Sequence, residues 1–125
     1  MIKVVLAGVA LVVGFTGAAS AQDAAAGAKV FAKCKACHVI DAATNRVGPS
    51  LHGIIGRPAG TVEGFKYSES MLQHGKDGLV WNNENLDKYL ADPKGFIPKN
   101  KMAFPGLKNA EDRANVIAYI DEASK

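Results

Sequence analysis

The sequence predicts a small all-α domain, and three observations support that fold class. Helix-forming stretches with suitable capping residues stand near both ends of the chain and again between them. The segment 39–65 is interrupted by glycine and proline and shows no strand-length alternation of apolar and polar residues. The length of 125 residues fits one domain. We therefore expect helices joined by long structured loops.

The first 21 residues have the pattern of a secretory signal peptide. An early lysine precedes an apolar run of about 16 residues, which is shorter than the ~20 residues of a membrane-spanning helix. Small residues at Ala19 and Ala21 predict cleavage before Gln22. Residues 1–21 are thus the predicted signal peptide and residues 22–125 the domain, located in the periplasm. An uncleaved N-terminal anchor is the alternative.

The first two helices are predicted from capping residues and composition. Asp23 is a suitable N-cap for a helix over residues 24–37, in which alanine and lysine, both good helix formers, are frequent. A shorter helix is expected from Ser68 to His74, because Gly75 follows directly.

Two further helices are predicted in the second half of the chain. Asn82 or Asn83 can cap a helix over residues 84–91, which Pro93 ends. The last helix is expected to begin near Asn109, because the acidic residues that follow suit the positive end of a helix dipole. The proline-rich segment 93–106 between these helices is expected to be irregular.

The long segment 39–65 suggests that the domain encloses a cofactor. Loops of this length inside a small compact domain need a group to pack around. The segment holds too few apolar residues to form a core unaided, and a domain of this size folds with little stability to spare. A large apolar cofactor would supply the missing core.

The motif CKACH at residues 34–38 contains both cysteines of the chain. A thiol–disulfide pair usually lies in a βαβ setting, which the sequence does not show. A zinc site needs four ligands, and the chain has no second C-x-x-C. C-x-x-C-H is also the attachment motif of c-type haem, in which Cys34 and Cys37 reach the two vinyl edges of one porphyrin and His38 lies under the iron. We favour haem, with thiol redox chemistry as the main alternative.

A six-coordinate haem iron needs a second axial ligand, and the chain offers four candidates. Met71 belongs to a predicted amphipathic helix, where a methionine is usually core filler. Met102 lies in a polar, proline-rich segment where a thioether has little structural use, so it is the preferred ligand. His52, in a glycine-rich loop, and His74, which we expect to be exposed, remain open.

Several blocks of sequence, in the same order, resemble class I c-type cytochromes, the mitochondrial cytochrome c family and its soluble bacterial relatives. GAKVF precedes CKACH, and GPSLHGIIGR, GFKYS, LDKYLADP, IPKNKMAFPG and VIAYI follow it. The resemblance implies a fold in which the N- and C-terminal helices cross closely. In that fold Gly27 allows the close approach and Tyr119 packs near it.

The resemblance also implies the iron site. It makes Cys34 and Cys37 the thioether attachments of one covalent haem c, with His38 as proximal ligand and Met102 as distal ligand. Pro49 matches a proline whose carbonyl accepts a hydrogen bond from the ligating imidazole, which fixes the ring orientation.

Further cofactor contacts are implied around the rest of the haem. Arg57, Tyr67 and Trp81 match residues near the buried propionate. Tyr89 matches the tyrosine that faces the methionine sulfur, and Phe104 matches an aromatic residue that covers the exposed haem edge. Asn100 stands where a hydroxyl residue is common in the family. A propionate contact from its amide is therefore an open question.

The function that the resemblance implies is one-electron transfer, not catalysis. With both axial positions filled by protein atoms, a substrate has no open site, and thioether ligation favours ferrous iron. Such a carrier would shuttle between a quinol-oxidising complex or dehydrogenase and a terminal oxidase or photosynthetic reaction centre. A haem peroxidase, a small-ligand binder and a thiol–disulfide oxidoreductase are the rival hypotheses.

The charge distribution favours acidic protein partners. The net charge is +3, and no aromatic platform is interleaved with basic residues, which argues against nucleic-acid binding. A ring of lysines around the haem edge would steer a monomeric carrier to transient encounters with membrane redox complexes. The expected members of this lysine ring are Lys33, Lys35, Lys94, Lys99 and Lys101.

Overall fold

The computed structural model describes residues 8–11 and 22–125. Its helices are α1 (Ala24–Phe31), α2 (Glu69–Lys76), α3 (Asn83–Ala91), α4 (Pro93–Phe96) and α5 (Ala110–Ala123). In this part of the chain there is no strand, only an isolated antiparallel bridge between Pro58 and Val80. The prediction of an all-α domain is confirmed.

The predicted signal peptide falls mainly on residues 1–7 and 12–21, which lie outside the described residues. The predicted cleavage before Gln22 therefore stays a prediction. Among the described helices, none has the length and apolar character needed to cross a membrane.

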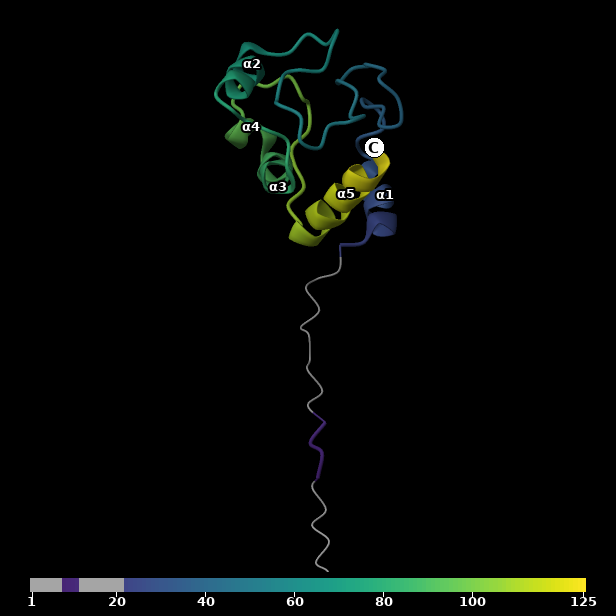
Figure 1. Ribbon diagram of the computed structural model, residues 1–125. Helices are drawn as coiled ribbons and strands as arrows, with labels where there is room; N and C mark the ends of the chain where they lie inside the picture. Colours follow the sequence, from purple (N-terminus) through teal and green to yellow (C-terminus); the bar gives the residue numbers. More distant parts are fainter. Residues whose placement is uncertain (1–7, 12–21) are drawn as a thin grey trace, which may run out of the picture.

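Helices α1 and α5 pack side by side, and Figure 1 shows them as the blue and yellow ribbons at one end of the domain. Gly27 makes the contact possible, because a Cβ at this position would collide with the Asn115 carbonyl oxygen. The rings of Phe31 and Tyr119 meet across the contact, with centroids 5.0 Å apart. The Asp23 N–H also donates to the Asn115 side-chain oxygen at 3.0 Å. The expected close crossing of the terminal helices is present.

The prediction of a helix over residues 24–37 is wrong in its second half. Regular helix ends at Phe31, and residues 32–37 form turns. The N–H groups of Cys34 and Lys35 both donate to the Phe31 carbonyl, at 2.8 and 3.2 Å, which tightens the backbone beyond α-helical geometry. The His38 N–H then donates to the Cys34 carbonyl at 3.0 Å. The motif CKACH therefore lies on consecutive tight turns.

Three of the remaining helices begin near the expected positions. The Ser68 hydroxyl caps α2, the Asn82 amide caps α3 and the Asn109 amide caps α5 by accepting hydrogen bonds from first-turn N–H groups at 3.0, 2.8 and 2.8 Å. These bonds satisfy donors that a helix start leaves without partners. Helix α2 extends two residues beyond the predicted end at His74, through a glycine to Lys76.

Helix α4 corrects the expectation that residues 93–106 are irregular throughout. Pro93, which ends α3, occupies the first turn of α4, where its missing N–H has no cost. The Asp92 carboxylate caps the turn by accepting from the Gly95 N–H at 3.1 Å. Helix α3 packs against both α4 and α5. These contacts hold the start of segment 93–106, which contains Met102, against the rest of the domain.

Candidate functional site

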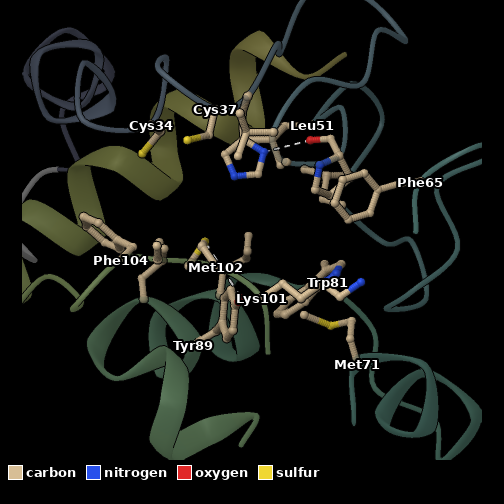
Figure 2. A pocket seen from close by; sticks show the side chains of 18 of the residues that line it. Cys34, Cys37, Leu51, Phe65, Met71, Trp81, Tyr89, Lys101, Met102 and Phe104 are labelled. Carbon is tan, nitrogen blue, oxygen red and sulfur yellow. Dashed lines mark hydrogen bonds between the residues drawn. The ribbon is translucent and has the colours of Figure 1, made fainter. Parts of the chain in front are cut away.

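One mostly apolar cavity of about 240 Å³ lies among the helices and the long loops. A single buried water needs only ~15 Å³, so the cavity is a binding site for a large group and not a packing defect. Figure 2 shows Cys34 and Cys37 on one side of this space and Met102 and Tyr89 on the other. Side chains from α2, α3 and α5 complete the apolar walls: Met71, Leu86, Leu90, Val116 and Ile120.

The cysteine wall also carries an oriented imidazole. The His38 Nδ1–H donates to the Pro49 carbonyl at 2.7 Å, shown as the dashed line in Figure 2, and this leaves Nε2 as the nitrogen with a free lone pair. Gly48 gives the ring its space, since a Cβ there would collide with the imidazole. Burial lowers the pKa of His38, and the bond to Pro49 only partly opposes this. The neutral ring, which is the form that binds metals, is therefore favoured.

The two cysteines do not have the properties of a thiol redox pair. Both are free and partly exposed. Burial raises the pKa of the Cys34 thiol, Cys37 adds to the rise and Lys33 partly opposes it. Reactive thiols in C-x-x-C motifs need a lowered pKa. No group of three or more His, Cys, Asp or Glu side chains in the described part of the chain is arranged to hold a metal ion, which also disfavours zinc.

The opposite wall presents a thioether beside a phenol. The Tyr89 hydroxyl donates to the Met102 sulfur at 3.9 Å, and its ring packs against Trp81 with centroids 5.0 Å apart. Burial raises the pKa of Tyr89 to about 12, so the hydroxyl keeps its proton at neutral pH. Phe104 also lines the cavity on this side and is partly exposed.

Two polar groups in the lining can still donate a hydrogen bond. The Tyr67 oxygen accepts from the Val62 N–H at 3.0 Å and retains its own proton for another acceptor. Trp81 also lines the cavity, and its indole carries an N–H donor. A buried carboxylate in this cavity would need such donors.

The structure brings together every predicted site residue except Arg57. Arg57 lines a separate polar hollow, where its guanidinium donates to the Thr61 carbonyl at 3.2 Å. Of the candidate distal ligands, Met102 and Met71 line the cavity, whereas His52 faces the hollow of Arg57. His74 is also absent from the cavity lining, and its Nδ1–H donates to the Ser70 carbonyl at 2.8 Å.

Sequence reasoning missed some residues that shape the site. Gly48 makes room for the His38 ring, a role that was not predicted. Phe65 and Leu51 line the cavity from the long loop (Figure 2), and neither was singled out within the blocks GFKYS and GPSLHGIIGR that contain them. The position of Gly48 directly before Pro49, at the start of GPSLHGIIGR, is the sequence signal for this role.

The cavity is lined by two thiols, an oriented imidazole and a thioether. Comparison with known proteins identifies the family of the chain. The family model "Cytochrome c" matches residues 24–124. Cytochrome c2 iso-2 of Magnetospirillum fulvum is 59% identical over 90 residues, which are 72% of this chain and 91% of that protein. Cytochrome c type-1 of Ascaris suum is 48% identical over 104 residues, 82% of this chain and 90% of that one.

A solved structure gives the same result. The ferricytochrome c2 of Rhodopseudomonas palustris superposes with a TM-score of 0.75 at 40% identity, covering 82% of this chain and 99% of that one. This chain therefore belongs to the cytochrome c family, as a class I c-type cytochrome whose role is electron transfer and not enzymatic catalysis. Members of this family carry covalently bound haem c.

Proposed function

We propose that the chain is a soluble periplasmic one-electron carrier, with haem attached through Cys34 and Cys37 and iron bound by His38 and Met102. The supporting observation is the arrangement of the cavity, with two thiols and an oriented neutral imidazole facing a thioether across an apolar space. When bound, haem supplies a reversible one-electron iron couple.

The protein contributes orientation, exclusion of water and hydrogen bonds. The Pro49 carbonyl fixes the His38 ring and raises its basicity as a ligand. The Met102 thioether favours the reduced metal, and the Tyr89 hydroxyl orients it. Tyr67 and Trp81 offer the donors that a buried propionate requires. Both ligand positions would be occupied by protein atoms, so the site is suited to electron transfer without substrate binding.

We assign the docking face to the mouth of the cavity. All five lysines of the lysine ring are exposed, and Lys33 and Lys101 line the cavity itself. No member forms a salt bridge with a carboxylate among the described residues, so their charge is available to an acidic partner. The partners would be a quinol-oxidising complex or dehydrogenase as donor and a terminal oxidase or photosynthetic reaction centre as acceptor.

The lysine ring has a kinetic test. Stopped-flow association with an acidic redox partner should slow as ionic strength rises, because screening weakens electrostatic steering. A Lys33→Gln/Lys35→Gln variant should show a lower rate and a smaller salt dependence. Lys125→Gln, an exposed lysine outside the ring, is the control that should leave both unchanged. A flat salt dependence of the wild-type rate would remove the docking proposal.

The iron ligands have a spectroscopic test. Ferric protein with a thioether ligand shows a weak far-red charge-transfer band, which Met102→Ala should abolish. Met71→Leu is the matched control, because Met71 also lines the cavity and should leave the band intact. High-spin iron without this band in the wild type would contradict the assignment of Met102.

Cofactor attachment and export can be tested together. The denatured mass of protein isolated from the periplasm should equal that of residues 22–125 plus one haem. Alkylation after reduction should label neither Cys34 nor Cys37, because thioether sulfurs do not react. Labelled cysteines and a mass without haem would refute covalent attachment.

A further inference from the structure

Asn100 is among the most buried polar residues of the described chain, with a relative exposure of 3%. Its side-chain nitrogen donates to the carbonyls of Pro93 and Ile97, both at 2.8 Å. Its side-chain oxygen accepts from the Met102 N–H at 2.9 Å and from the Lys94 ammonium at 3.5 Å. The amide therefore uses both donors and both acceptor positions within the chain.

These bonds join α4 to the backbone of Met102. Pro93 begins α4 and Ile97 follows its end, so the two donated bonds fix the amide against both ends of one helical turn. The accepted bond then holds the Met102 N–H at a set position beyond the turn. The backbone of Asn100 is tied to the same turn, because its N–H donates to the Ile97 carbonyl at 3.3 Å and its carbonyl accepts from Lys94.

The same bonds rule out a direct contact of this amide with the cofactor. Both N–H groups are occupied by backbone carbonyls, and Asn100 does not line the cavity. A hydroxyl residue has only one donor and cannot bind both carbonyls while also accepting from Met102. The asparagine thus has a structural role that a serine or threonine cannot reproduce.

We propose that Asn100 is a positioning residue for the Met102 thioether, acting through the backbone of Met102. The inference rests on the proposed role of Met102 as distal ligand. The hydrogen bonds of the Asn100 side chain to Pro93, Ile97 and Met102 are here called the Asn100 clamp. When the clamp is intact, the segment leading to Met102 has one favoured conformation, in which the Met102 sulfur lies beside Tyr89. When the clamp is removed, the segment gains alternatives in which the sulfur leaves the cavity, and the sixth iron position becomes open to an external ligand.

The test is competition between Met102 and imidazole in the ferric holoprotein. Apparent imidazole affinity is proportional to the fraction of molecules in which Met102 has left the iron. We expect Asn100→Ala to lower the apparent Kd about tenfold, which corresponds to ~1.4 kcal/mol. Loss of the far-red band during the titration reports displacement of the thioether directly.

Control variants separate positioning from general destabilisation. Asn82→Ala removes an N-cap whose amide accepts from the Asn85 N–H at 2.8 Å and which does not line the cavity. It should lower the unfolding temperature while leaving imidazole affinity within twofold of wild type. If Asn100→Ala yields no folded holoprotein, Asn100→Thr serves instead, since it keeps one donor and one acceptor and should lower the apparent Kd severalfold.

The outcomes distinguish this inference from the proposed function. A wild-type protein without the far-red band would contradict ligation by Met102 and, with it, the role of Asn100. A wild type with the band, together with Asn100 variants whose imidazole affinity stays within twofold of wild type, would overturn the role of Asn100 alone.

Discussion

Replacing Gly27 by alanine tests whether the close packing of α1 on α5 determines the stability of the domain. A methyl group at this position collides with the Asn115 carbonyl oxygen and approaches the Cβ of Tyr119, so one helix must move. Overpacking of this kind costs ~1–3 kcal/mol, and we take the upper part of the range because the obstacle is backbone. The hydrogen bond from the Asp23 N–H to Asn115, at 3.0 Å, would be strained or lost, for a further ~1 kcal/mol.

Helix propensity opposes these losses of stability. Alanine is a better helix former than glycine by ~1 kcal/mol, so the net destabilisation is ~2–3 kcal/mol. For a domain of this size, that lowers the unfolding midpoint by about 10–20 °C. The assay is thermal unfolding of the holoprotein followed by far-UV circular dichroism. Ala25→Gly, on the exposed side of α1, is the control and should cost at most the propensity term, ~1 kcal/mol. A Gly27→Ala midpoint at or above that of wild type would refute the reasoning.

Three further predictions concern backbone strain, tyrosine ionisation and the cofactor. Lys99 has a φ of 61°, a conformation that costs a lysine more than a glycine, so Lys99→Gly should raise the free energy of unfolding by ~0.5–1 kcal/mol in denaturant titrations. Burial raises the pKa of Tyr67, so above about pH 10 the unfolded state loses the phenol proton first and the free energy of unfolding falls as pH rises. Tyr67→Phe should make that fall shallower in denaturant titrations at increasing pH. An unchanged dependence of the free energy of unfolding on pH would contradict the raised pKa. A Cys34→Ala/Cys37→Ala chain purified without haem should show a weak helical circular dichroism signal and no cooperative thermal transition, whereas native-like helicity would contradict a structural role for the cofactor.

Local signals predicted where three helices begin, because a cap is an interaction between residues two or three positions apart. Asn82 caps α3 as expected, and Ser68 and Asn109 cap the helices that were predicted to begin near them. The two errors concern the end of the first helix and the start of α4, where more than one backbone conformation suits the local sequence. Alanine and lysine favour continued helix beyond Phe31, yet the backbone tightens there into turns. Pro93 ends the predicted helix over residues 84–91, and a proline that ends one helix is also well suited to begin the next.

The site was predicted from a motif and a family resemblance, and the limits of that approach are visible at particular residues. Cys34, Cys37 and His38 of the motif line one cavity together with Pro49 and Met102, as the resemblance implies. Arg57 lines a separate hollow, so its predicted contact with a haem propionate stays a prediction. The hydrogen bonds from the Asn100 side chain to the Pro93 and Ile97 carbonyls could not be predicted from the sequence. These carbonyls come within reach of Asn100 only because the chain turns at Lys99.

The cavity also explains why the chain needs long loops that cannot form a core by themselves. Its walls include Trp81, Tyr89 and Val116, which are buried members of the only large hydrophobic cluster in the described chain. An unfilled apolar cavity costs ~24 cal/mol per Å³, so about 240 Å³ corresponds to ~6 kcal/mol at most, because this cavity opens to solvent. Domains of this size have a total stability of ~5–15 kcal/mol. A large apolar group bound there is therefore part of the hydrophobic core, and folding and cofactor binding are coupled.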